Sequence, residues 1–400
     1  MSEAHIQRDM AYLAGELLHR GSNTESERSA AEYLKERFGA YASDTEIDDF
    51  AAIDSCEYVF ASYYAESLIV SLAAFWFPRV ALCYGAMVFL AYLSEFMGYR
   101  VFSRFLPHFE TQNVMARFLA PRPKRLVIVT AHYDSGRESV FAAPKFLPWL
   151  RAAHEGVVVC MLVVLLTCAI QGAGILGERA LYVALAARWL AVAALLAASA
   201  ALFYSAAFGD FVRGANANAS GVAALPALAE RIAECPFEES DVWLVATGSD
   251  ETWMSGMRRL VTTHAPDRDT TYFLNIEHVG AGALHYTTGE GMLSVLPASS
   301  ELVGAAGAVA DQYHASACRL RAVPGSALVP LTRGYKGMSI VRLGPDGTPQ
   351  NWRRHTDTLV HTDYVLIKEA AQFAEAVLRC LESGPRADGA EALRASTARD

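Results

Sequence analysis

The sequence predicts an α/β protein in which a mixed, mostly parallel sheet is flanked by helices. Short apolar runs with strand character alternate with amphipathic stretches of helical spacing along most of the chain. Several of these runs end in a histidine or a carboxylate, and an α/β sheet builds its ligand sites at the carboxyl ends of its strands. Two long apolar segments interrupt the alternation, and they predict helical hairpins inserted into the fold.

The bulk composition excludes some functions. The 400 residues are 53% hydrophobic, and the formal net charge of −9 comes without any run rich in Lys and Arg. Nucleic acid is therefore not expected as a partner, because phosphate binding needs a concentrated basic face. The seven cysteines are scattered without a Cys-x-x-Cys spacing, so neither a disulfide framework nor a cysteine zinc site is predicted.

The individual elements follow from periodicity. Apolar residues at helical spacing predict two opening helices, Ile6–Leu18 and Glu25–Phe38. A further helix is expected at Val222–Ala233, and a helix at Tyr364–Leu381 closes the fold. The expected strands are Thr111–Leu119, Arg125–Thr130, Asp241–Ala246, Tyr272–Ile276 and Met338–Leu343.

The second apolar insert, residues 156–209, carries the stronger signal for a membrane. It has two charge-free runs, Gly156–Gly177 and Trp189–Gly209, and each reaches the roughly 20 residues that a spanning helix needs. A Pro-Arg pair divides the first insert, residues 67–97, into two shorter runs. If the flanking segments form one domain, each insert crosses an even number of times, so the first is expected as a short, tilted or re-entrant hairpin. The alternative is a helical pair inside a soluble core, although such cores rarely contain two runs of this kind.

These features predict one domain over residues 1–382, carrying the two inserts, and a disordered tail over residues 383–400. The protein is therefore expected in a membrane as a multi-pass chain, and its polar start predicts no cleavable signal peptide. Basic residues near the inserts are more numerous on the domain side, which favours a cytoplasmic domain. They are Arg100, Arg104, Lys145, Arg151 and Arg213, against Arg79, Arg179 and Arg188 on the hairpin side.

Strand ends that are distant along the chain carry residue types that bind metals. They are His132, the Asp250-Glu251 pair, Glu277 and, after the last strand, His355. Imidazole nitrogens and carboxylate oxygens are the usual zinc ligands outside cysteine sites. Asp134 stands two residues after His132, where a carboxylate can accept the other imidazole N–H and fix the tautomer that binds metal. A lone histidine at a strand end is more often a core residue whose ring is hydrogen-bonded. The order of His132 and these acids along the chain favours a metal site instead.

Taken together, five motifs resemble the di-zinc aminopeptidases and their relatives, which include the glutamate carboxypeptidases and the glutaminyl cyclases. The motifs are Thr130–Ser135, Gly214–Gly221, Asp250-Glu251 with Gly256, Asn275–Gly280 and His355–Thr358. Their order and spacing agree from the opening helices to Leu381. The resemblance implies a zinc-exopeptidase fold in which two zinc ions activate a water for peptide-bond hydrolysis.

The resemblance also implies a role for each strand end. His132 matches one metal ligand, and Asp134 matches the acid that orients it. Asp250 matches the general base, Glu251 the carboxylate of the other zinc, and Glu277 the carboxylate of the first zinc. Asp250 stands where relatives usually carry Glu, so its side chain is one methylene shorter. Glu277 stands where they usually carry Asp, so its side chain is one methylene longer.

Two departures remove ligands that the family uses. Ala217 stands where relatives carry the carboxylate that bridges both metals, and Arg353 stands where they carry a histidine. Arginine cannot ligate zinc, because it stays protonated and has no lone pair to offer. Two dications about 3.5 Å apart repel by roughly 19 kcal/mol at an effective dielectric near 20, a cost that the bridging anion normally offsets. We expect the Arg353 guanidinium to replace a cation and to pair with Glu251 or Asp250.

The altered site leaves zero or one zinc ion expected, in place of the family's two. The remaining candidate ligands are His132, Glu251, Glu277 and His355, with Asn216, Asn218 and His278 as further donors. Two functions from different classes stay open: a membrane-anchored exopeptidase of aminopeptidase type with an altered or single-metal centre, and a non-catalytic binding or assembly protein of the membrane. The expected partners are a peptide substrate or peptide-like ligand and membrane lipid, and nothing in the sequence identifies a protein partner.

Overall fold

The computed structural model describes the chain except for residues 1, 176, 265–266, 322, 324 and 385–400, so most of the predicted tail lies outside the described residues. The chain divides into two compact units. The first unit contains the sheet and comprises Met1–Asp54, His108–Pro148 and Asp210–Asp400. The second unit is helical and comprises Ser55–Pro107 and Trp149–Gly209.

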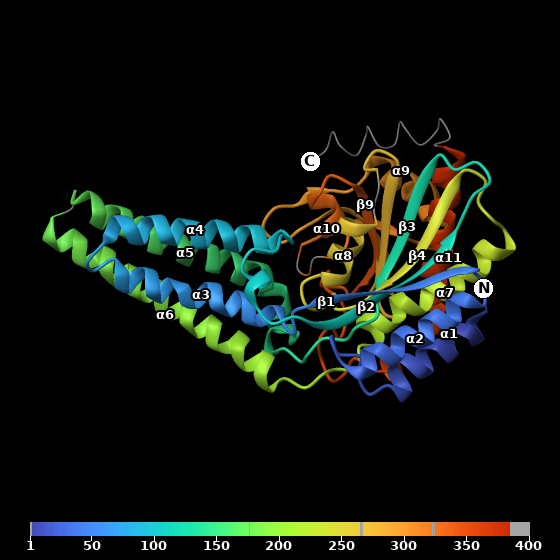
Figure 1. The fold of residues 1–400 in the computed structure, drawn as a ribbon, viewed down its shortest axis with the longest axis horizontal. Helices are drawn as coiled ribbons and strands as arrows, with labels where there is room; N and C mark the ends of the chain where they lie inside the picture. Colours follow the sequence, from blue (N-terminus) through green and yellow to red (C-terminus); the bar gives the residue numbers. More distant parts are fainter. Residues whose placement is uncertain (1, 176, 265–266, 322, 324, 385–400) are drawn as a thin grey trace. The chain divides into compact units, whose positions relative to one another are not determined.

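A nine-stranded mixed sheet forms the centre of the first unit (Figure 1). Its order is β1-β2-β4-β3-β5-β9-β6-β7, with β8 beside β6. The four strands β4, β3, β5 and β9 run parallel, whereas β1 and β2 are antiparallel additions at one edge. The strands are β1 Asp44–Ala52, β2 Phe109–Phe118, β3 Arg125–His132, β4 Ser240–Thr247, β5 Thr271–Glu277, β6 Ala283–Glu290, β7 Leu296–Pro297, β8 Ser316–Leu320 and β9 Lys336–Leu343.

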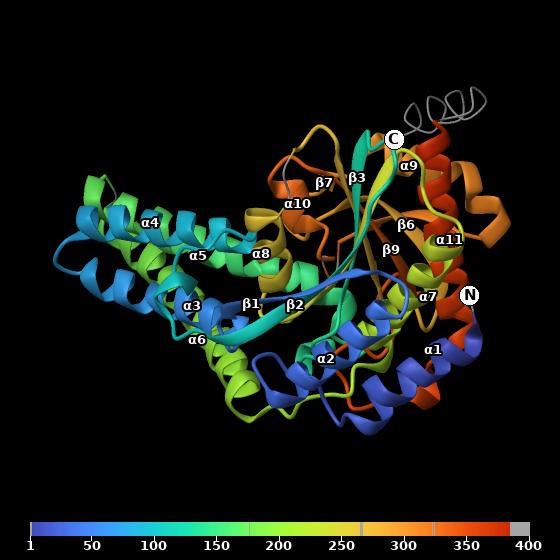
Figure 2. The ribbon, with the colours of Figure 1, turned by 45° about the vertical axis from the view of Figure 1, so that its right-hand side comes forward.

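Helices cover both faces of this sheet, which confirms the predicted α/β fold (Figure 2). The larger apolar core joins one face to α1 Glu3–Met10, α2 Glu25–Gly39, α7 Ser220–Glu234, α9 Ser300–Val309 and α11 Tyr364–Ser383. The smaller core joins the other face to α8 Ser255–Thr263 and α10 Leu328–Thr332. Every residue of β5 is buried, as expected for a parallel strand that has helices on both sides.

Local sequence sets where these helices begin. Thr24 caps α2 by accepting the backbone N–H of Glu27, and Asp363 caps α11 by accepting that of Val365. Capping of this kind satisfies a backbone donor that the helix leaves unpaired, and each cap is worth about 1 kcal/mol. The buried residues of α11 then recur every three or four positions from Ile367 onwards, which gives the helix one apolar face toward the sheet.

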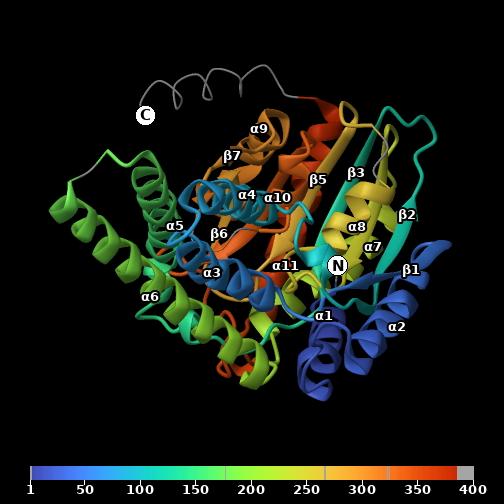
Figure 3. The same ribbon diagram turned by 60° about the vertical axis from the view of Figure 1, so that its left-hand side comes forward.

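The second unit is built on four long helices that form two hairpins (Figure 3). They are α3 Cys56–Ala73, α4 Pro78–Phe96, α5 Leu150–Ala173 and α6 Glu178–Phe208. Three described helices, α4, α5 and α6, are long and apolar enough to cross a membrane by length and composition. Helix α3 begins ahead of the apolar run at residue 67, because the tyrosine-rich stretch before that run continues the helix. Pro78 stands at the start of α4, where proline is tolerated because no partner for its missing N–H is needed.

Candidate functional site

The carboxyl ends of β3, β4 and β5 bring the predicted site residues to one edge of the sheet. His132 is the last residue of β3, and Glu277 is the last residue of β5. These two strands are paired in parallel, and parallel neighbours lie about 4.8 Å apart. Asp250 and Glu251 follow directly after β4, which pairs with β3 on its other side. The topology therefore gathers the histidine and the three acids at one place.

His132 and Asp134 form a buried pair just beyond β3. His132 Nδ1 lies 3.4 Å from Asp134 Oδ1. The other oxygen of Asp134 accepts hydrogen bonds from the Ser22 hydroxyl and the backbone N–H of Glu251, both at 2.8 Å. Burial lowers the pKa of His132, but the hydrogen bond and charge of Asp134, with the charges of Asp250 and Glu251, raise it to about 10. The neighbouring carboxylates therefore favour the protonated imidazole, and a metal ion that bound there would have to displace that proton.

Protein donors hold both carboxylate oxygens of Asp250. Oδ1 accepts the backbone N–H of Met257 at 3.1 Å, and Oδ2 accepts the hydroxyl of Ser326. Burial raises the pKa of Asp250 to about 6. A general base must reach the proton that it removes, so Asp250 would have to accept that proton beside the Ser326 hydroxyl.

Arg353 and Glu251 form an ion pair that two side-chain hydrogen bonds hold together. The Nε and Nη2 atoms of Arg353 donate to Glu251 Oε2 at 2.9 and 2.6 Å, and Nη2 also donates to the backbone carbonyl of Glu251 at 3.2 Å. The two side chains are only 12% and 10% exposed. Of the two partners that the sequence left open for Arg353, the structure places the guanidinium on Glu251.

The carboxylate of Asp357, which is far along the sequence, holds the turn that contains Ala217. Asp357 accepts the backbone N–H groups of Asn216 and Ala217 at 2.6 and 3.0 Å. Burial raises the pKa of Asp357 to about 7. Gly214 starts the turn with a φ of 60°, and a Cβ there would collide with the side chain of Asn218, so glycine is required. Ala217 is buried, and its methyl group offers no donor to a metal.

Glu277 and Glu290 are two buried acids that face the same glycine. They are 4% and 0% exposed. A Cβ at Gly325 would collide with Glu277 Oε1 and would lie 2.8 Å from Glu290 Oε2. Burial raises the pKa of Glu277 to about 8, and it raises the pKa of Glu290 as well. At neutral pH Glu277 is therefore mostly a neutral acid, closed in by the backbone of Gly325.

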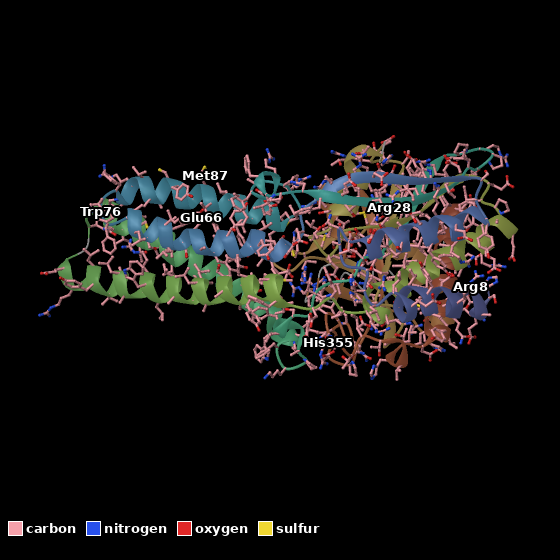
Figure 4. All side chains as sticks on the ribbon, turned by 60° about the horizontal axis from the view of Figure 1, so that its bottom comes forward. Arg8, Arg28, Glu66, Trp76, Met87 and His355 are labelled. Atoms are coloured by element: carbon pink, nitrogen blue, oxygen red, sulfur yellow. The ribbon has the colours of Figure 1, made fainter. Side chains whose placement is uncertain are left out.

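The structure does not bring His355 into this cluster. Its imidazole is 57% exposed, and Nε2 lies 2.8 Å from Glu138 Oε2, which is also exposed. Figure 4 shows His355 at the surface. A pair of this kind contributes little to stability, because water screens both charges.

The residues present do not fit a pair of zinc ions. Across the parts of the chain that the structure describes, no group of three or more His, Cys, Asp and Glu side chains could hold a metal ion. The Glu251 carboxylate is paired with Arg353, and Ala217 stands at the bridging position. A catalytic zinc normally keeps three protein ligands. Two protein cations, the imidazolium and the guanidinium, balance the acids instead.

Three residues of this region had no recognisable signal in the sequence: Arg20, Glu290 and Ser326. Arg20 is fully buried beneath the site and donates to the carbonyls of Tyr133 and Gly214 at 2.7 and 3.1 Å. Only the Pro-Gly turn before Ser326 is visible in the sequence, and nothing marks its hydroxyl as the partner of Asp250. These contacts join segments far apart in the chain, so local periodicity carries no information about them.

We expect the stability of the protein to fall as the pH rises through the range in which Glu277 titrates. The pKa of its carboxyl is about 8 in the fold against an ordinary 4.5. Between these values the folded state holds a proton that the unfolded chain has released, so the free energy of unfolding decreases by up to about 1.4 kcal/mol per pH unit. Unfolding of the wild type and Glu277→Gln, measured at several pH values in chelator, should show a shallower slope for the variant. A wild-type stability that rises with pH over this range would contradict the prediction.

Gly325→Ala is expected to destabilise the protein by about 1–3 kcal/mol, because the added methyl group has no room beside Glu277. Gly304 in α9 is the matched control, since a Cβ there meets nothing within 4 Å. Gly304→Ala should be neutral or stabilising by up to about 1 kcal/mol, as alanine is the better helix former. Chemical denaturation of both variants measures the difference, and equal midpoints would refute the close packing at Gly325.

Residues 196–378 match the family model described as Peptidase family M28. This range contains the Gly214–Gly221 turn, the acids that follow β4 and end β5, and Arg353, whereas His132 and Asp134 precede it. No curated protein matches the chain.

Solved structures share the fold at low sequence identity. A zinc aminopeptidase from Bacillus subtilis has a TM-score of 0.56 at 12% identity and covers 94% of each chain. The LapA aminopeptidase of Legionella pneumophila has a TM-score of 0.54 at 9% identity, covering 96% of this chain and 71% of its own. A glutaminyl cyclase from Tannerella forsythia has a TM-score of 0.53 at 14% identity, covering 95% of this chain and 97% of its own. At these identities the likeness shows the fold alone.

Proposed function

We propose that this chain, a protein of the Peptidase M28 family with the fold of the zinc aminopeptidases and glutaminyl cyclases, is anchored in a membrane and has lost di-zinc catalysis. It acts by binding a peptide or peptide-like ligand, or a partner in the membrane, and not by hydrolysis. The observation that carries this proposal is the nearly buried ion pair between Arg353 and Glu251.

The ion pair opposes zinc in two ways. First, the guanidinium holds one of the two Glu251 carboxylate oxygens through two hydrogen bonds. Second, it places a permanent positive charge beside that oxygen, and a buried pair loses about 3–5 kcal/mol when one partner is taken away. Ala217 supplies no carboxylate that could offset the repulsion between two metal ions. The site is therefore stable as a set of protein charges without metal.

Exposed aromatic residues at both ends of the helices support the membrane anchor. At one end lie Trp76 and Phe77, in the turn between α3 and α4, which are 73% and 65% exposed (Figure 4). At the other end lie Phe105 beyond α4, Trp149 before α5 and Phe208 at the end of α6, which are 78%, 69% and 71% exposed. Between the two ends many of the exposed side chains of these helices are apolar, as at Met87, Leu90, Val159, Leu162 and Leu166. Two aromatic belts around an apolar band are typical of a membrane span.

Of the charged residues of α6, which also include Glu178 and Arg179 at its start, Arg188 faces inward. Arg188 is fully buried, and its Nη1 donates to Gln171 Oε1 of α5 at 2.9 Å. Its guanidinium also lies over the ring of Phe75, 5.8 Å from the centroid. Ionisable residues of spanning helices face the interior of the bundle, because lipid cannot solvate them. This placement supports a lipid environment around the four helices.

Peptidase assays on the full chain in lipid nanodiscs test the loss of catalysis. The protein is incubated with aminoacyl-coumarin amides, with added zinc in one arm and a chelator in the other. We expect no hydrolysis above the rate of empty nanodiscs in either arm. Chelator-sensitive hydrolysis by the unmodified chain would contradict the proposal and would make the protein an altered-site aminopeptidase.

Extraction and flotation of membranes test the anchor separately. After expression, membranes are washed with alkaline carbonate and floated on a density gradient. The full chain should stay with the vesicles, because a spanning hairpin resists such washing whereas a peripheral protein does not. Release of the chain into the soluble fraction would contradict the anchor.

A further inference from the structure

A short antiparallel ladder in the first unit joins the chain before the α5–α6 hairpin to the chain after it. We call residues 136–138 and 210–212 the exit ladder. Arg137 and Phe211 form its β-bridge, and backbone hydrogen bonds of 2.8 and 3.0 Å flank them. Residue 210 follows α6 after a single glycine, so the ladder is covalently continuous with the hairpin.

The exit ladder also contacts the ion pair of the site. Ser139, the residue after the first ladder strand, donates its backbone N–H to the carbonyl of Arg353 at 3.2 Å. Gly136 is buried, and a Cβ there would lie 2.8 Å from Glu251 Oε2 and 3.0 Å from Arg353 Nε. The backbone of the ladder is therefore in direct contact with both members of the pair, and it cannot move toward them without displacing them.

Phe211 holds the ladder against the loop that precedes α2. The Phe211 ring stacks on the His19 ring, with the two centroids 4.9 Å apart. The Arg137 guanidinium lies 4.0 Å from the centroid of the Phe211 ring. A Cβ at Gly21 would collide with this ring, so the loop packs closely on it. The ladder is therefore packed between this loop and the Arg353–Glu251 pair.

We propose that the exit ladder couples the lipid bilayer to the Arg353–Glu251 pair, so that the tilt of the α5–α6 hairpin sets how tightly the site is closed. The inference rests on the membrane anchor proposed above and names a regulation of the same site. Helix α6 has 31 residues, but its charge-free part, residues 189–208, has 20, or about 30 Å at 1.5 Å per residue, so it is longer than the hydrocarbon core only in bilayers thinner than the usual roughly 30 Å. A helix longer than the core tilts by an amount that depends on bilayer thickness. Because binding free energies are linked, a ligand that opens the ion pair would in turn shift the tilt of the hairpin.

Hydrogen exchange on the full chain in nanodiscs of two thicknesses tests this coupling. The thin and thick fluid bilayers are dimyristoleoyl and dieicosenoyl phosphatidylcholine, and the amides followed are those of Ser139 and Glu251, which lie on either side of the ion pair. We expect their exchange rates to differ between the bilayers by about fivefold or more, the lower range of measured couplings. Equal rates in the two bilayers would overturn the inference.

Two ladder variants and one control locate the route. Phe211→Ala should abolish the difference between the bilayers, whereas Phe203→Ala, an exposed change on α6 outside the ladder, should keep it. A disulfide made by Arg137→Cys with Phe211→Cys keeps the strands joined without the ring, since the flanking hydrogen bonds make this a close antiparallel pair of about 4.5 Å between Cα atoms. The oxidised variant should retain the difference between the bilayers. Loss of the difference in this variant, or its persistence in Phe211→Ala, would overturn the ladder as the route.

The outcomes separate the two proposals. A chain that fails to float removes the membrane anchor and the coupling together. A chain that floats but shows equal exchange in both bilayers removes only the coupling. Chelator-sensitive peptidase activity removes the proposed loss of catalysis and leaves the bilayer comparison unaffected.

Discussion

Arg353→Met is expected to destabilise the protein by about 3–5 kcal/mol, because it leaves the Glu251 carboxylate nearly buried without its counter-charge. The carboxylate is 10% exposed, so water cannot replace the two hydrogen bonds that the guanidinium donates. Chemical denaturation of the full chain in detergent, followed by near-ultraviolet circular dichroism, gives the change in unfolding free energy. A loss below about 1 kcal/mol would contradict a buried ion pair and would be typical of a surface pair.

A double variant and a surface control show whether charge is the cause. In Glu251→Gln with Arg353→Met neither group is charged, so most of the lost stability should return. A double variant that is as unstable as the single one would place the cause in packing. Arg28→Met removes an arginine that is 43% exposed and pairs with the exposed Asp49, and it should change stability by about 1 kcal/mol at most.

Arg20→Met is the second change with a large expected effect. Arg20 is fully buried and donates to the carbonyls of Leu13, Tyr133 and Gly214 and to Asn218 Oδ1. Burial lowers its pKa to about 10, so the group remains charged at neutral pH. Methionine fills similar space but donates no hydrogen bond, and each buried acceptor left alone costs about 1–3 kcal/mol. The expected loss is therefore about 4 kcal/mol or more.

Thermal unfolding of Arg20→Met beside Arg8→Met measures this loss. Arg8 lies on α1 with a side chain that is 56% exposed, and its replacement should leave the unfolding temperature nearly unchanged. If Arg20→Met unfolds at the wild-type temperature, the four acceptors find other donors and Arg20 does not hold the turn below the site. Cooperative unfolding with a large shift is the expected result.

The edge of the sheet that carries the site could be predicted from the sequence, whereas the contacts within the site could not. Apolar runs in the sequence located the strands. Parallel pairing brings the carboxyl ends of β3, β4 and β5 together independently of the conformation of the loops. Beyond β4 the backbone leaves regular geometry, with positive φ values at Ser249, Trp253 and Met254. Strand alternation cannot tell where a side chain points after such turns, so the sequence could not choose between Asp250 and Glu251 as the partner of Arg353.

The hairpins were predictable in kind but not in extent. The second insert follows directly from composition, and α5 and α6 span most of residues 156–209. In the first insert, α3 begins at Cys56 and carries Glu57 and Glu66, which lie before the apolar run that begins at residue 67 and defined the insert in the sequence. Tyr84 of α4 donates its hydroxyl to Glu66 at 2.7 Å, so the helix pair satisfies one of these charges internally. Only the fold shows that such a charged residue belongs to the helical unit.

Zinc content measured by elemental analysis tests the central claim most directly. The unmodified chain and the variant Ala217→Asp with Arg353→His are equilibrated with zinc in nanodiscs and dialysed, and bound metal is counted per chain. We expect no stoichiometric zinc in the unmodified chain, where protein cations balance the acids. We expect a gain of zinc in the variant, which regains a bridging carboxylate and an imidazole. Two equivalents of zinc in the unmodified chain would contradict the central claim.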